Sequence, residues 1–210
     1  MRFGMIGALA LAGTAVLFCG PAKAQTPGGT STACDVHFYP ADGIHSVGED
    51  FDAVKRVDQD LKHYYEVAGR SLDWLTPKRQ AEVLADVRVG EIIGVSEQAR
   101  VAHAEPLSRR EAIAPGPRAP AGAGCSVELM LPQVMLERGG LAERSVRVFG
   151  VVRRYEDGAQ VSTFSSYGAA PMPGFQLRSP ADADKATQVV EQAYRGAVEE
   201  LLRNAAKPKL

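Results

Sequence analysis

Alternating apolar and polar positions mark four segments of the chain, and this period of two predicts β-strands with one buried face. The segments are residues 34–39, 125–131, 145–155 and 159–167. Asp157-Gly158, a dipeptide typical of two-residue hairpin turns, separates the last two segments and predicts that they pair as a hairpin. Pro132 lacks a backbone N–H, so we expect an edge strand or a break where it follows the second segment.

Apolar residues recur at steps of three and four in three other segments, which predicts amphipathic helices. These helices cover residues 51–68, residues 77–86, and the stretch from Ser179-Pro180 to about Asn204. Thr76-Pro77 is a typical start signal, with a capping side chain followed by proline at the first helical position. Residues 87–95 fit a strand or a continued helical turn, and periodicity does not decide between the two.

The order of these elements favours an α+β fold with a small antiparallel sheet of about four strands. Two longer helices and one short helix are expected to pack on one face of that sheet. Residues 104–124 are rich in proline, alanine and glycine, so we expect a long surface loop there within a single domain over 34–207. Residues 25–33 read as a flexible lead-in. The layout is similar to that of small envelope-associated α+β domains, including auxiliary subunits of outer-membrane transport systems.

Residues 1–24 predict a secretory signal peptide. Arg2 provides a positive start, residues 5–18 are almost wholly apolar, and residues 22–24 (Ala-Lys-Ala) supply the small side chains that signal peptidase accommodates. Cleavage would leave a mature chain that begins at Gln25. The apolar run is shorter than the roughly 20 residues of a membrane-spanning helix, which argues against an uncleaved anchor. We expect no transmembrane segment in the mature chain.

The chain has three cysteines, and Cys19 would leave with the signal peptide. The remaining pair, Cys34 and Cys125, stands at the starts of two predicted strands of an exported chain. We therefore predict a disulfide bond between them rather than two buried free thiols. Cys19 offers an alternative as the acylated residue of a lipoprotein, although Phe18 before it is large for such a site. We expect a periplasmic or secreted protein, with lipid anchoring through Cys19 as the minor alternative.

Charge and motifs argue against several classes of function. The 210 residues include 24 basic and 25 acidic side chains, a net charge of −1, so the basic excess typical of nucleic-acid-binding proteins is missing. The sequence contains no Gly-x-Ser-x-Gly elbow, no Cys-x-x-Cys pair and no glycine-rich phosphate loop. We therefore expect no cofactor and favour a non-enzymatic protein.

A histidine–carboxylate cluster formed by Asp35, His37, Asp42 and His45 offers an alternative function. Imidazole and carboxylate groups together can bind zinc or another divalent ion, which would suit a metal-assisted hydrolase. The spacing of the cluster matches no metal-binding motif, and an ordinary polar strand and turn explain the same residues. His37 and His45 are the metal ligands of this alternative.

One predicted strand offers a binding surface. Four residues of the segment 145–155 would share the face turned away from the helices: Arg147, Phe149, Arg153 and Tyr155. Arginine and aromatic side chains on an open sheet face would suit an envelope protein, a lipid head group or a polysaccharide. The alternative is that the loop at 104–124 covers this face. The sequence thus predicts an exported, disulfide-containing envelope protein that acts as a binding or assembly accessory module.

Overall fold

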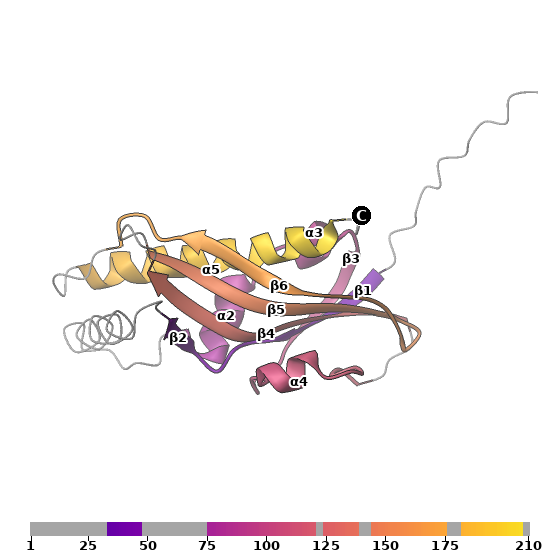
Figure 1. The fold of residues 1–210 in the computed structure, drawn as a ribbon. Helices are drawn as coiled ribbons and strands as arrows, with labels where there is room; N and C mark the ends of the chain where they lie inside the picture. The colour runs from indigo at the N-terminus through magenta and orange to yellow at the C-terminus, as the bar shows by residue number, and fades with distance from the viewer. Residues whose placement is uncertain (1–32, 48–74, 121–123, 139–143, 176–181, 208–210) are drawn as a thin grey trace, which may run out of the picture. The chain divides into compact units, whose positions relative to one another are not determined.

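A computed structural model describes residues 33–47, 75–120, 124–138, 144–175 and 182–207 (Figure 1). The predicted signal peptide and the helix expected at 51–68 lie outside the described residues. The expected helix start at Ser179-Pro180 also falls outside them, as do the side chains of residues 45–47.

The described residues form a mixed sheet, which corrects the expectation of a purely antiparallel one. Its strands are β1 (Ala33–Tyr39), β2 (Ile44–Val47), β3 (Ser96–Ala102), β4 (Cys125–Arg138), β5 (Arg144–Glu156) and β6 (Ala159–Pro171). The main order is β3-β1-β4-β5-β6, and the short β2 pairs with β4. β1 runs parallel to both β3 and β4, whereas β4, β5 and β6 are antiparallel. Parallel pairing is possible because long connections separate β1 from both partners.

The hairpin formed by β5 and β6 confirms the prediction made from Asp157-Gly158. Both residues have positive φ, 49° and 80°, as a type I′ turn requires, and this turn matches the twist of paired strands. The alternation along β5 is confirmed as well, since Val146, Val148 and Val152 all belong to the main core.

Pro132 lies inside β4 at an irregularity, so it marks neither an edge strand nor a break. The pairing of β4 with β5 shifts between Met130 and Gln133. On the other side of β4, the pairing with β1 ends at Met130 and the pairing with β2 begins at Val134. A residue without a backbone N–H is tolerated there because the ladders on both sides are interrupted.

Four helices occur in the part of the chain that the structure describes: α2 (Pro77–Leu84), α3 (Val89–Ile93), α4 (Arg109–Ile113) and α5 (Ala183–Ala206). α2 begins as predicted, and the Thr76 side chain caps it by accepting from the backbone N–H of Arg79 at 3.2 Å. α3 resolves the ambiguous segment as a helical turn. It ends at Gly94, whose φ of 77° is readily adopted by glycine.

The main core lies between one face of the sheet and α5, with α2 and α3 contributing to it (Figure 1). Gln80 of α2 is fully buried there. Its side chain donates to the carbonyl oxygens of Ala41 and Leu75 and accepts from the Tyr194 hydroxyl at 3.2 Å. These bonds satisfy an amide whose burial would otherwise be costly, and they connect α2 to α5 and to the turn after β1.

α4 packs against the opposite face of the sheet (Figure 1). Two of the three expected helices, α2 and α5, share the main-core face as predicted, whereas α4, a helix that was not predicted, lies on the other face. A second, smaller buried cluster forms there from Tyr39, Ala112, Met130, Phe149 and Val151. At this position the domain thus has three layers: the helices of the main core, the sheet, and α4.

Gly168 of β6 lets α5 approach the sheet closely. A methyl group at this position would overlap the carbonyl oxygen of Ala197 and lie 2.7 Å from the backbone nitrogen of Leu201. Because these atoms are helix backbone, they cannot turn away. We expect Gly168→Ala to lower the free energy of unfolding by about 1–3 kcal/mol, as measured by urea denaturation.

Gly43→Ala is the matched control for this prediction, since nothing lies within 4 Å of the added methyl group. Its free energy of unfolding should stay within about 0.5 kcal/mol of the wild type. Equal stability of the two variants would contradict the close packing of α5 on β6.

Candidate functional site

The arginine and aromatic residues of β5 lie on the face opposite the main core, as the alternation predicts, but most of them are buried. Phe149, Arg153 and Tyr155 are 6%, 3% and 4% exposed, respectively. The expectation of an open strip is therefore wrong for these three residues. Arg147 alone keeps an exposed side chain, at 44%. The alternative that the segment 104–124 covers this face describes the arrangement better.

The covering segment is shaped by α4 and its capping box. The Ser108 hydroxyl accepts from the backbone N–H of Glu111 at 3.2 Å, and the Glu111 carboxylate accepts from the backbone N–H of Ser108 at 2.8 Å. This reciprocal pair satisfies free donors at the helix start. Ala112 then enters the second buried cluster with no exposed surface. Within residues 104–120, the described part of the expected surface loop, α4 and the buried Ala119 cover this face of the sheet, and most of the other residues are exposed.

Arg153 attaches this cover to the sheet. Its guanidinium donates to three backbone carbonyl oxygens of the covering segment: those of Ala112 at 2.9 Å, Ala114 at 2.7 Å and Gly116 at 2.9 Å. A planar group with five N–H donors suits such a fan of acceptors. Arg153 therefore has a structural role, which replaces the partner-binding role expected from the sequence.

Glu128 makes the complementary attachment from the neighbouring strand β4. Its Oε1 accepts from the backbone N–H groups of Arg118 and Ala119, the latter at 2.7 Å, and the residue is fully buried. Strand pairing places it directly opposite Arg153. Its Oε2 has no hydrogen-bond partner among the described residues. Two buried side chains thus hold the covering segment. The Glu128 carboxylate accepts from two successive backbone N–H groups, and the Arg153 guanidinium donates to three backbone carbonyl oxygens.

Arg147, the exposed residue of the predicted strip, belongs to an arginine–aromatic ladder that also includes the buried Phe149, Arg109 of α4 and Tyr167 of β6. The Arg109 guanidinium lies 4.3 Å from the centroid of the Phe149 ring. That ring packs against Tyr167 at 5.1 Å, and the Arg147 guanidinium lies 5.4 Å from the Tyr167 ring. Arg147 also donates to Glu137 at 3.0 Å. Cation–π contacts of this kind orient both guanidinium groups beside aromatic surface.

The proposed metal cluster is not assembled by the described residues. The His37 ring contacts His103, with 3.2 Å between His37 Nδ1 and His103 Nε2. Asp35 is half-buried on β1, and Asp42 is exposed beyond it. No group of three or more potential ligands gathers within the described part of the chain. The His45 side chain lies outside that part, so its role as a ligand stays a prediction.

Tyr39 stacks on His103, with ring centroids 4.0 Å apart and nearly parallel planes. Burial lowers the pKa of His103, and the neighbouring His37 lowers it further. Burial of the Tyr39 phenol, together with the nearby Glu128 carboxylate, raises the pKa of that phenol to about 12. The Tyr39 hydroxyl has no hydrogen-bond partner among the described residues. This corner of the sheet therefore disfavours negative charge on Tyr39.

A pH dependence follows from the raised pKa of Tyr39. An unfolded tyrosine ionises near pH 10, so the folded state retains this proton over the pH range from about 10 to about 12. The stability that this proton contributes is fully present below pH 10 and is lost as pH rises towards 12. We expect the absorbance titration of wild type minus Tyr39→Phe to show a tyrosine that ionises near pH 12. The same difference measured in urea should show a midpoint near pH 10; a midpoint near 10 in both conditions would contradict burial of the phenol.

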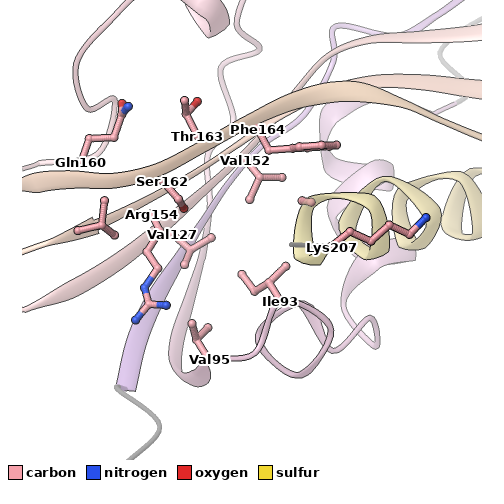
Figure 2. A pocket seen from close by; sticks show the side chains of 12 residues that line it. Ile93, Val95, Val127, Val152, Arg154, Gln160, Ser162, Thr163, Phe164 and Lys207 are labelled. Carbon is pink, nitrogen blue, oxygen red and sulfur yellow. The ribbon is translucent and has the colours of Figure 1, made fainter. Parts of the chain in front are cut away.

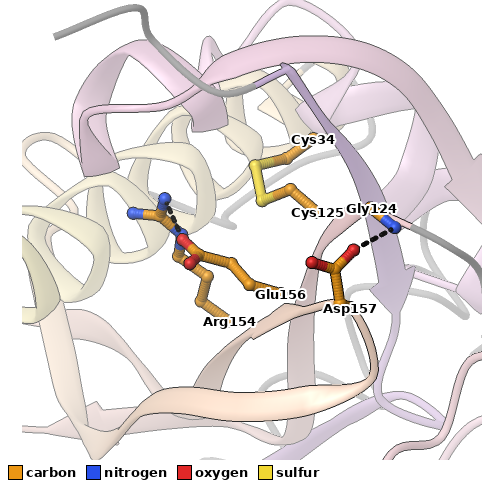
Figure 3. The surroundings of a disulfide bond; sticks show 6 residues. All are labelled: Cys34, Gly124, Cys125, Arg154, Glu156 and Asp157. Carbon is orange, nitrogen blue, oxygen red and sulfur yellow. Dashed lines mark hydrogen bonds and ion pairs between the residues drawn. A yellow bond between two sulfur atoms is a disulfide. The ribbon is translucent and has the colours of Figure 1, made fainter.

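The disulfide between Cys34 and Cys125 is present, which confirms the pairing predicted from the sequence. The two residues are direct partners in the parallel pairing of β1 with β4, with Cα atoms 4.4 Å apart. Figure 3 shows the bond beside the start of the β5–β6 turn. There, Asp157 accepts from the backbone N–H of Gly124 at 3.2 Å. The bond and this contact together fix the start of β4.

None of the helices that the structure describes is long and apolar enough to cross a membrane. No family model matches the chain, and no curated protein matches it.

Two solved structures show distant similarity. Protein XCC0632 from Xanthomonas campestris, of family model DUF330, aligns at 9% identity with a TM-score of 0.36, over 84% of this chain and 86% of that chain. Lipoprotein GNA1162 from Neisseria meningitidis aligns at 11% identity with a TM-score of 0.22, over 76% of this chain and 96% of that chain.

Proposed function

We propose that this protein is exported to the cell envelope and acts there as a non-catalytic binding or assembly accessory module. The observation that carries the proposal is the buried disulfide between β1 and β4. Such bonds persist in oxidising compartments and are rare in reducing ones. The signal-peptide pattern of residues 1–24 supports the same location.

The arginine–aromatic ladder is the surface we propose for partner binding. Arg147 and Tyr167 are 44% and 37% exposed, and Phe149 supports them from below. Arginine and tyrosine are enriched in protein interfaces because each combines apolar area with hydrogen-bonding groups. Two guanidinium groups flank the rings, and among the described residues only that of Arg147 has a carboxylate partner, Glu137. The partner that fits best is an envelope protein with an acidic surface.

We expect the double variant Arg109→Ala/Arg147→Ala to reduce recovery of a cross-linked envelope partner by about tenfold, which corresponds to about 1.4 kcal/mol of binding energy. The measurement is quantitative co-purification from intact cells after cross-linking. Arg203→Ala is the control, because Arg203 is exposed on α5, away from the ladder, and forms an ion pair with Glu199 of the same helix. Equal recovery with the ladder variant and the control would contradict this surface.

The intact mass of the purified protein tests the location. A chain that begins at Gln25 would support a soluble exported protein. A chain that begins at an acylated Cys19 would support the lipid-anchored alternative, and a chain that retains residues 1–24 in the cytoplasm would contradict export. Because this measurement does not involve the ladder, it separates failure of the export proposal from failure of the binding surface.

A further inference from the structure

A cavity of about 470 Å³ opens at the end of the main core, between the sheet and the ends of α3 and α5. Figure 2 shows Val127 and Val152 of the sheet on one side of this space and Ile93 on the other. The cavity reaches the surface, because Val161 on its wall is 50% exposed. Its volume lies within the range of roughly 300–1,000 Å³ that is typical of small-molecule sites.

The walls of the cavity are largely apolar. Six apolar residues from the core side contribute to them: Ile93, Val95, Val127, Val152, Phe164 and Ala205. Such walls favour an aliphatic chain, since each buried methylene group is stabilised by removal from water. Besides Arg154 and Lys207, the polar lining residues are Gln160, Ser162 and Thr163 of β6.

The charged residues of the cavity wall are all cationic. Arg154 and Lys207 line it, and none of the other described lining residues is acidic. The Arg154 Nε is buried and has no hydrogen-bond partner among the described residues, although Nη2 of the same side chain pairs with Glu156 at 2.6 Å. The Lys207 ammonium donates to the neutral side chain of Asn204 at 2.8 Å. In Figure 2 the two cations lie on opposite sides of the apolar group around Ile93.

We propose that this cavity binds an anionic amphiphile with a single aliphatic chain, such as a fatty-acid carboxylate. The chain lies against the valines and Phe164, and the carboxylate accepts from Arg154 or Lys207. Three features support this assignment: mostly apolar walls around a sufficient volume, a buried Arg154 N–H without a partner among the described residues, and charged lining residues that are all positive. This site is separate from the arginine–aromatic ladder, which lies on the opposite face of the sheet.

Calorimetric titration with laurate, below the concentration at which it forms micelles, tests the proposal directly. Dodecanol is the matched neutral probe, since it has the same chain without the charge. We expect the full mature chain to bind laurate at least about tenfold more tightly than dodecanol, which is about 1.4 kcal/mol of discrimination. No binding of laurate, or equal affinity for both probes, would overturn the proposal.

Two variant pairs locate the binding site. Arg154→Gln/Lys207→Gln should weaken laurate binding by about tenfold, whereas Lys78→Gln/Arg88→Gln removes two exposed cations that do not line the cavity and should leave the affinity unchanged. Equal weakening by the two pairs would show nonspecific charge attraction and would overturn the assignment.

A steric variant tests the cavity without disturbing the core. Ser162→Trp fills it from an exposed position on β6, and Ser165→Trp places the same ring on the opposite face of that strand. Only Ser162→Trp should abolish laurate binding, and retained binding would overturn the site.

Discussion

Replacing Cys34 and Cys125 together with alanine is expected to lower the free energy of unfolding by about 2–5 kcal/mol. The bond joins residues 91 positions apart, so its loss releases a long loop in the unfolded chain. Both cysteines are also buried in the main core, and their removal leaves unfilled space. Because a typical domain is stable by only 5–15 kcal/mol, the variant should approach its unfolding threshold.

Urea denaturation of the oxidised wild type, the reduced wild type and the alanine variant measures this effect. Reduction retains both sulfur atoms, so it isolates the constraint that the bond places on the chain. Thiol titration of the denatured, unreduced mature chain should find no free thiol. Two free thiols, or equal stability of all three samples, would contradict the contribution assigned to the bond.

Arg153→Met is the second substitution for which we expect a large loss, about 3–5 kcal/mol. The change removes the Arg153 donor from three carbonyl oxygens of the covering segment, of which that of Ala112 is buried. The Ala114 oxygen keeps a second donor in Arg118 at 2.9 Å. It also removes the positive charge directly opposite the buried Glu128 carboxylate. Methionine keeps most of the side-chain volume, so the loss reports on hydrogen bonding and charge rather than on a cavity.

Arg147→Met is the matched control, because it lies on the same strand and the same face but is exposed. Its loss should stay below about 1 kcal/mol, as for other surface ion pairs. Limited proteolysis should also cut the segment around α4 faster in the Arg153 variant. If both variants unfold at the same urea concentration, Arg153 does not attach the cover.

Adding Glu128→Gln to Arg153→Met should lower the free energy of unfolding by less than the sum of the two single effects, since the two side chains hold one segment.

Local patterns in the sequence predict the elements whose buried faces are clear. The hairpin at Asp157-Gly158, the Thr76 cap of α2 and the apolar stripe of α5 all depend on neighbouring residues, so they can be recognised without the fold. The disulfide could be predicted because only two cysteines remain after the expected cleavage. These features explain why the α+β class was correct.

The features that were missed depend on partners far away in the chain. β3 is an edge strand whose residues are all at least partly exposed, so it lacks the alternation that identifies a strand. The parallel direction of β1 is decided by how its long connections return, which no local pattern records. The capping box of Ser108 and Glu111 was visible, but the helix after it has only five residues and too little apolar rhythm to stand out.

The candidate site, too, could be predicted from local patterns only in part. The alternation along β5 placed Arg147 and Arg153 on one face correctly, yet the two residues differ in exposure because α4 covers only one of them. The role of Arg153 depends on the backbone carbonyl groups that accept its hydrogen bonds. Every residue type has such a group, so the sequence does not mark these acceptors. The cavity could not be predicted for a similar reason, since tertiary packing places Arg154 and Lys207 on the wall of one cavity.

The pairing of β1 with β4 has a consequence for biogenesis under the proposed export. Cys34 would cross the membrane long before Cys125, because the two are 91 positions apart. Cys34 would therefore stay reduced, or form a mixed disulfide, until the later strand emerges. The mature chain then holds only these two cysteines, and oxidation has no wrong intramolecular product to correct. Maturation in vivo should therefore require a thiol oxidase but no disulfide isomerase.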